Sequence, residues 1–146
     1  MEQSLAAIPT IGLGTYRLED ETAYKSVLSA LNLGYRHIDT ATRYKNELQV
    51  GKAIKASGIP RSQIWITTKV PMELVKKTNC ELHILKSIKK SLESLGTDYI
   101  DLLLLHAPVH ERSDPKHMEK NIAAWKVLEK MMRGEIEDLK GKIRVY

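Results

Sequence analysis

Residues 34–51 read GYRHIDTATRYKNELQVG, and this stretch decides the fold. It begins with a glycine that ends a helix and continues as a short strand over Tyr35–Thr40. A polar turn that carries Tyr44 follows, and Asn46 is predicted to cap the next helix. Asp39 therefore lies at the carboxyl end of a strand, with Tyr44 in the loop after it. In a parallel α/β fold, catalytic groups collect at that end of the strands.

Strand-like and helical segments alternate along the rest of the chain. The predicted strands are Ile11–Thr15, Tyr35–Thr40, Gln63–Lys69, Tyr99–His106 and Ile143–Tyr146. The predicted helices are Asp20–Leu33, Asn46–Ala56, a helix that opens at the capping box Thr78–Glu81 and stops at Gly96, and one after the polar connection 107–120. Parallel strands joined by helices in sequence order favour a (β/α)8 barrel of the TIM type, and a doubly wound sheet is the competing architecture.

The number of strands bounds how much of a barrel is present. A closed barrel needs eight strands in about 250 residues. The 146 residues supply about four βα units and the start of a fifth strand. We therefore expect residues 1–146 to form a single unit, an incomplete (β/α)8 barrel.

Apolar residues at helical spacing predict which face of each helix is buried. The three stripes are Ala23, Val27 and Leu31; Leu82, Leu85, Ile88, Leu92 and Leu95; and Ile122, Trp125, Leu128 and Met132. The segment 99–106, YIDLLLLH, is almost continuously apolar, as expected of a parallel strand that is covered on both faces.

Composition excludes several classes of protein. Hydrophobic residues make up 42% and charged residues 28% of the chain, which is typical of a globular domain. The net charge is +5, but no basic stripe interleaves with aromatic residues, so we expect no nucleic-acid binding. The longest apolar run, Leu102–Leu105, is too short to span a membrane. The single cysteine, Cys80, and an amino terminus without signal-peptide features favour a cytoplasmic protein.

Polar side chains end three successive strands. Asp39, Lys69 and His106 lie at these ends, and Tyr44 follows in the first loop. A tyrosine phenol, with a pKa of about 10, is a poor acid at neutral pH, but a nearby ammonium group stabilises the phenolate. A carboxylate fixes the ammonium group, and a histidine can orient a substrate carbonyl by a hydrogen bond. The four residues therefore predict an acid–base site.

Each of these residues also has an ordinary structural explanation. Taken alone, Asp39 is a turn residue, Tyr44 a surface residue, Lys69 a solvated strand end and His106 a core histidine. His37 is expected to serve packing, and Asp101, inside an apolar strand, to be a structural carboxylate bonded to backbone or a neighbouring helix. Loop polarity explains the set His110, Asp114 and His117 better than a metal site does.

Five segments resemble the amino-terminal half of the aldo-keto reductases. They are GLGTY (12–16), GYRHIDTATRYKNELQVGKAI (34–54), SGIPRSQIWITTK (57–69), SLESLGTDYIDLLLLHAP (91–108) and GKIR (141–144). This resemblance implies a (β/α)8 barrel that transfers hydride from NADP(H) to an aldehyde or ketone. It implies a catalytic tetrad of Asp39, Tyr44, Lys69 and His106, with Tyr44 as proton donor and Lys69 as the residue that makes it a better acid.

The resemblance also implies where cofactor and substrate bind. The loop made of Gly12, Leu13, Gly14, Thr15 and Tyr16 matches a cofactor-facing loop, and Asp39 matches a further cofactor contact. Tyr16, Tyr44 and His106 match positions that face the substrate. The same loop contains GxG but lacks the third glycine of a dinucleotide-binding fingerprint, which argues against a Rossmann fold.

Two departures from the family pattern affect the expected function. The connection 133–144, RGEIEDLKGKIR, is longer than usual and is expected to be a surface elaboration. The family's nicotinamide-stacking residues and its basic site for the 2′-phosphate lie beyond the fourth helix and are not among the 146 residues.

Three functions follow as hypotheses. The first is an NADPH-dependent carbonyl reductase. The second is a truncated, catalytically inactive half-barrel that acts as an interaction or assembly module, with self-association through open barrel edges. The third is another (β/α) barrel enzyme that binds phosphate, which is disfavoured because no glycine-rich phosphate loop is present.

Overall fold

The structure is a computed structural model that describes residues 8–109 and 115–145. Five strands form one parallel sheet in the order β1-β2-β3-β4-β5. The strands are β1 Leu13–Gly14, β2 His37–Asp39, β3 Trp65–Val70, β4 Ile100–Leu105 and β5 Ile143–Val145. The helices are α1 Asp20–Asn32, α2 Glu47–Ala56, α3 Met72–Val75, α4 Cys80–Leu95 and α5 His117–Met132, and the short 3-10 turns are η1 Thr42–Tyr44, η2 Arg61–Gln63 and η3 Glu137–Leu139.

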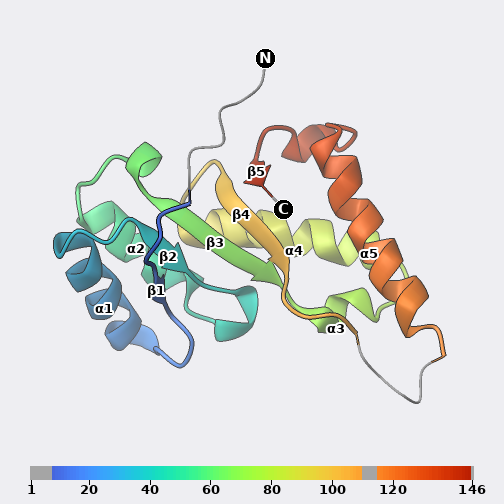
Figure 1. Cartoon of the computed structure of the whole chain (residues 1–146), viewed down its shortest axis with the longest axis horizontal. Coiled ribbons are helices and arrows are strands. Elements are labelled where there is room, and N and C mark those ends of the chain that lie inside the picture. Colours follow the sequence, from blue (N-terminus) through green and yellow to red (C-terminus); the bar gives the residue numbers. More distant parts are fainter. Residues whose placement is uncertain (1–7, 110–114, 146) are drawn as a thin grey trace.

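The arrangement is that of an incomplete barrel, as predicted. The helices α1, α2, α4 and α5 pack against one another in the same order as the strands that they connect (Figure 1). A doubly wound sheet would reverse its strand order at a switch point. The observed order has no reversal, so that alternative is wrong.

Helix α1 has the predicted face and the predicted end. Ala23, Val27 and Leu31 are buried. Gly34 has a left-handed φ of 97°, and the Tyr35 N–H donates to the carbonyl oxygen of Ala30. A glycine takes this conformation without a steric penalty, so the chain can turn directly into β2.

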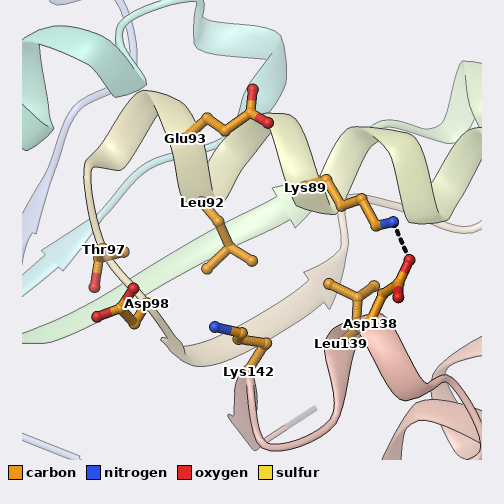
Figure 2. Close-up of a pocket in the computed structure, with 8 residues that line it drawn as sticks. All are labelled: Lys89, Leu92, Glu93, Thr97, Asp98, Asp138, Leu139 and Lys142. Carbon is orange, nitrogen blue, oxygen red and sulfur yellow. Dashed lines mark hydrogen bonds and ion pairs between the residues drawn. The ribbon is translucent and has the colours of Figure 1, made fainter.

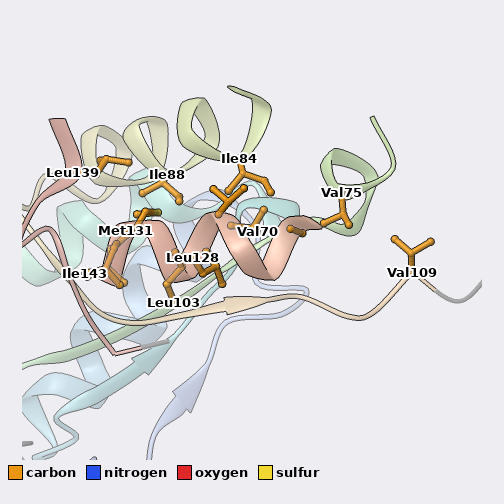
Figure 3. Close-up of a cluster of buried hydrophobic side chains, with 13 residues drawn as sticks. Val70, Val75, Ile84, Ile88, Leu103, Val109, Leu128, Met131, Leu139 and Ile143 are labelled. Carbon is orange, nitrogen blue, oxygen red and sulfur yellow. The ribbon is translucent and has the colours of Figure 1, made fainter. Parts of the chain in front are cut away.

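Two hydrophobic clusters form the core. The larger lies between β3, β4, α4 and α5 and includes Val70, Ile88, Leu103 and Leu128 (Figure 3). The second joins α1, α2 and the first three strands. The packing of α2 on α4 is so close that a Cβ at Gly51 would overlap the backbone of Leu95.

The predicted start of α4 is wrong. The capping box placed the helix start at Thr78, but α4 begins at Cys80, after Asn79 in a left-handed conformation without a side-chain cap. Its buried side also differs from the predicted stripe. Ile88 and Leu95 are buried as predicted, and Leu85 and Leu92 pack partly buried against the core, whereas Leu82 is 45% exposed and the buried face also includes Ser87 and Ser91.

The predicted buried face of α5 is wrong except at Leu128. Ile122, Trp125 and Met132 are 52%, 45% and 63% exposed. The residues that are buried instead are Ala124, Val127 and Met131. Three of the four predicted residues therefore lie on a surface that the described part of the chain leaves open to solvent.

The connection after α5 is more than a surface elaboration. Its turn η3 inserts Leu139, which is 2% exposed, into the larger core cluster. Beside Leu139, Asp138 forms an ion pair with Lys89 of α4 at 2.6 Å, and both residues line a groove together with Lys142 (Figure 2). The expectation of a purely superficial connection is therefore wrong.

Asp101 is a structural carboxylate, as predicted. It is 2% exposed and accepts hydrogen bonds from the Ile66 N–H, from Arg61 Nη2 at 2.6 Å and from Arg144 Nη1 at 3.1 Å. Its charged partners are the two arginines, Arg61 from the short 3-10 helix η2 and Arg144 from β5. Asp101 therefore connects β3, β4 and β5.

Among the described residues, no helix is both long and apolar enough to cross a membrane.

Candidate active site

The carboxyl ends of β2, β3 and β4 lie side by side, because these strands are neighbours in the sheet. The structure brings Asp39, Lys69 and His106 together at these ends. The Lys69 Nζ atom is 2.5 Å from Asp39 Oδ1, with which it forms an ion pair. The same atom donates to the carbonyl oxygen of Thr40 at 3.0 Å and lies 3.3 Å from Tyr44 Oη.

The short turn η1 holds Tyr44 over the carboxyl ends of these strands. The Tyr44 N–H donates to the carbonyl oxygen of Ala41, and Lys45 follows with a left-handed φ of 59°. Two other rings contact the Tyr44 ring. The Tyr16 ring lies 5.2 Å away, and the His106 ring lies 5.5 Å away in an edge-on orientation. The phenol therefore has an ammonium group on one side and an imidazole on another.

His106 differs from a satisfied core histidine. Its backbone N–H donates to the carbonyl oxygen of Val70, but its buried Nδ1 atom has no hydrogen-bond partner in the structure. Desolvation lowers the pKa of His106 below the usual 6.5, and the nearby charge of Lys69 lowers it further. The imidazole is therefore neutral at neutral pH, which suits a hydrogen bond to a carbonyl group.

The loop Gly12–Tyr16 lies beside the carboxyl end of β2. Gly14 is paired with Asp39 in the sheet, and the N–H of the buried Thr15 donates to the carbonyl oxygen of Asp39 at 2.9 Å. Tyr16 is 61% exposed, and a Cβ at Gly14 would meet no atom within 4 Å. Leu13 is half-buried, and Gly12 packs against the imidazole of His37.

The other histidines and the aspartate considered from the sequence do not join this site in the described residues. His37 Nε2 lies 2.9 Å from Thr67 Oγ1, and desolvation lowers the pKa of His37. His110 and Asp114 lie outside the described residues, and His117 is the first residue of α5. Within residues 8–109 and 115–145, no three side chains that commonly ligate metals are grouped.

Sequence reasoning missed two buried residues next to Tyr44. Asn46, predicted as a helix cap, occupies that position without capping the helix, because its side chain bonds to the loop after β1 instead. Glu47 is 6% exposed, and desolvation raises its pKa above the usual 4.5. The only sequence signal was the position of an Asn–Glu pair directly after the loop that carries Tyr44.

Comparisons with known proteins agree on one family. A sequence model described as the Aldo/keto reductase family matches residues 10–146. The chain is 51% identical over 102 residues to methylglyoxal reductase DkgB of Escherichia coli O157:H7, covering 70% of this chain and 37% of that relative. It is 48% identical over 114 residues to glycerol 2-dehydrogenase (NADP(+)) of Saccharomyces cerevisiae, covering 78% and 34%.

Solved structures give the same result. The aldo-keto reductase MGS-M4 from a Medee basin deep-sea metagenome library has a TM-score of 0.77 and 36% identity, covering 95% of this chain and 45% of that one. An aldo/keto reductase from Brucella melitensis has the same score and identity, covering 94% and 48%. The chain spans less than half the length of each of these relatives.

Proposed function

The chain belongs to the aldo/keto reductase family, and on this premise we propose that it reduces aldehydes or ketones to alcohols with NADPH. Residues 1–146 would supply the amino-terminal half of the barrel and the proton-donating side of its site. The observation that carries the proposal is the position of Lys69 Nζ, between Asp39 Oδ1 and Tyr44 Oη. The names of the relatives, a methylglyoxal reductase and an NADP(+)-linked dehydrogenase, support the substrate class and the cofactor.

Each residue of the tetrad has a distinct task in this proposal. Tyr44 donates its Oη proton to the carbonyl oxygen of the substrate. Lys69 stabilises the phenolate that remains, because its ammonium group lies 3.3 Å from that oxygen. Asp39 fixes the position of Lys69 and balances its charge. His106, neutral because its pKa is lowered, donates a hydrogen bond that orients the carbonyl group.

Asp39 and the loop Gly12–Tyr16 are suited to contact one part of an NADPH molecule. Bound NADPH would supply the hydride that the carbonyl carbon accepts. The side chain of Asp39 is 34% exposed, so a carboxylate oxygen is accessible to cofactor hydroxyl groups. The open space at Gly14 leaves room for a ligand beside the loop Gly12–Tyr16, and Tyr16 would close the substrate side.

The open edges of the sheet favour a second candidate, an assembly module that binds a second copy of the chain. The apolar residues Ile122 and Trp125 line a pocket together with Leu104 at one edge. Next to β1, the strand at the other edge, Ile11 lines a second pocket with Leu33, and the two side chains are 68% and 78% exposed. Two copies could each place one edge against the other, which would bury both surfaces.

A fusion protein tests the proposed reduction. Residues 1–146 are joined in frame to the carboxyl-terminal part of the E. coli methylglyoxal reductase. That part lies beyond the region of the reductase that matches this chain. NADPH consumption and alcohol formation are then measured with an aromatic aldehyde. We expect aldehyde-dependent consumption with one alcohol formed per NADPH. A fusion with a cooperative unfolding transition and no alcohol formation would contradict the proposal.

A further inference from the structure

The two residues that follow the Tyr44 loop, Asn46 and Glu47, are both buried although both are polar. They are 1% and 6% exposed. Polar residues at the start of a helix commonly cap it, but no side chain caps α2. The hydrogen bonds of both side chains run to other segments, and those segments carry the proposed site residues.

Asn46 holds the segments on one side of Tyr44. Its Nδ2 atom donates to the carbonyl oxygens of Thr15 and Leu18, both at 2.8 Å. Its Oδ1 atom accepts a hydrogen bond from Thr40 Oγ1 at 2.9 Å. The first two partners flank Tyr16, whose ring contacts Tyr44, and Thr40 directly follows Asp39.

Glu47 holds the segments on the other side. Its Oε1 atom accepts a hydrogen bond from Thr68 Oγ1 at 2.7 Å, and Thr68 immediately precedes Lys69. Its Oε2 atom accepts one from Ser91 Oγ at 3.2 Å. Ser91 Oγ is in turn 3.2 Å from Thr42 Oγ1, in the turn η1 that carries Tyr44. A continuous set of side-chain hydrogen bonds therefore joins Thr68, the neighbour of Lys69, to Thr42 in the turn that carries Tyr44.

Stability alone does not explain a carboxyl group at this place. Burying a carboxyl group costs free energy unless it is hydrogen-bonded, and replacing such a group together with its partners by apolar side chains of the same shape can be nearly neutral or stabilising. Hydrogen bonds, in contrast to apolar contacts, fix distance and direction. The arrangement is therefore suited to holding two strand ends and a turn at a set separation.

We propose that Asn46 and Glu47 are positioning residues that set the separation of Tyr44 Oη from Lys69 Nζ and the contact of Tyr16 with Tyr44. The role in catalysis rests on the proposed function, but the geometric role does not. A displacement of about 1 Å in such a site costs on the order of 100-fold in rate. Loss of either residue should therefore lower turnover without a direct contact to substrate.

Two serines of α4 provide a matched test. Ser91 and Ser87 are both buried and lie one turn apart, but Ser91 bonds to Glu47, whereas Ser87 Oγ has no partner in the structure. The full chain with ¹³C-labelled tyrosine rings is compared by NMR, with the Tyr44 signal assigned from Tyr44→Phe. The change in the Tyr44 chemical shift in Lys69→Met serves as the reference, because this variant removes the ammonium group beside the Tyr44 phenol.

The proposal predicts a specific order of effects. Ser91→Ala should move the Tyr44 signal in the direction of the Lys69→Met shift, and Ser87→Ala should leave it in place. Glu47→Ala should move it further, and Glu47→Gln should restore it, because an amide can accept from Thr68 and donate to Ser91. Asn46→Ala should move the Tyr16 and Tyr44 signals together. Equal shifts for both serine variants, or no shift for either, would overturn the positioning role.

Kinetics of the fusion protein separate this inference from the proposed function. Ser91→Ala should lower kcat roughly 10-fold and leave KM within about twofold, as expected for lost alignment rather than lost binding. An active fusion whose kcat is equal for the two serine variants would overturn the inference alone. An inactive fusion in which the Tyr44 signal still follows the predicted order would contradict the proposed function and support the geometric role.

Discussion

At the scale of single residues, Lys69 connects the groups of the candidate site. It joins Asp39 by an ion pair and approaches Tyr44 Oη, and its charge also acts on His106. The order of these residues along the chain was enough to predict that they meet, because parallel strands in sequence order place their carboxyl ends together. The contributions of Asn46 and Glu47 were not predictable in this way. All of the hydrogen-bond partners of their side chains except Thr40 lie at least 21 residues away in sequence, up to 44 residues for Ser91 and Glu47.

The titration of His106 tests the electrostatics of the site. Its pKa is lowered first by desolvation and then by Lys69. Lys69→Met should therefore raise the His106 pKa, and Lys52→Met, at an exposed position on α2, should not change it. The measurement is a histidine NMR titration, with the signal assigned from His106→Asn. An unchanged His106 pKa in Lys69→Met would show that the ammonium group does not act on the imidazole.

The same lowered pKa predicts how stability depends on pH. The unfolded chain binds a proton at His106 near the usual value of 6.5, whereas the folded chain binds it only at lower pH. The unfolded state is therefore favoured as pH falls below 6.5. The free energy of unfolding, measured with urea, should decrease over that range, and it should decrease less in His106→Asn. An equal decrease in both proteins would contradict the assignment to His106.

At the scale of helices and strands, the sequence predicted which elements exist better than which faces they bury. The stripe Ile122, Trp125, Leu128 and Met132 fits a helical spacing, but so does the buried set Ala124, Val127, Leu128 and Met131. Periodicity alone could not choose between them, because the choice depends on where α4 and β4 lie. The capping box predicted at Thr78 does not form, because Asn79 takes a left-handed conformation between Thr78 and the first residue of α4.

Gly51 provides a test of the packing between α2 and α4. Alanine has a higher helix propensity than glycine, by about 1 kcal/mol, and would stabilise an isolated helix. Here its Cβ would overlap the backbone of Leu95, which cannot move like a flexible side chain. Gly51→Ala should therefore lower the free energy of unfolding by roughly 1–3 kcal/mol. Lys52→Ala, one residue further on the exposed face, is the control, and a Gly51→Ala protein as stable as this control would refute the close approach.

At the scale of the whole molecule, no strand within the described residues pairs with the outer edge of β1 or of β5. The described part of β5 pairs with Ile100 and Leu102 of β4, and beyond that pairing an apolar pocket lies beside Ile122 and Trp125. The sequence predicted this openness from the strand count. It could not predict that α5 would present Trp125 to solvent, because that depends on the packing of the helix.

The open edges predict the behaviour of the isolated 146-residue chain. We expect it to self-associate and to bind NADPH weakly, because apolar edge surfaces are exposed and the chain supplies only part of a cofactor site. Trp125→Lys should shift the chain towards the monomer, whereas Lys86→Ala, at an exposed position on α4, should not. Sedimentation gives the size, and cofactor fluorescence gives the affinity. A compact monomer that binds NADPH with micromolar affinity would contradict this expectation.

The central claim is that Tyr44 donates the proton in carbonyl reduction, and turnover of Tyr44→Phe in the fusion protein tests it most directly. Tyr35→Phe, at an exposed tyrosine outside the tetrad, is the matched control. General acid catalysis typically contributes about 10²–10⁴-fold, so Tyr44→Phe should reduce turnover by at least two orders of magnitude, while Tyr35→Phe retains it. Equal turnover in the two variants would contradict the claim.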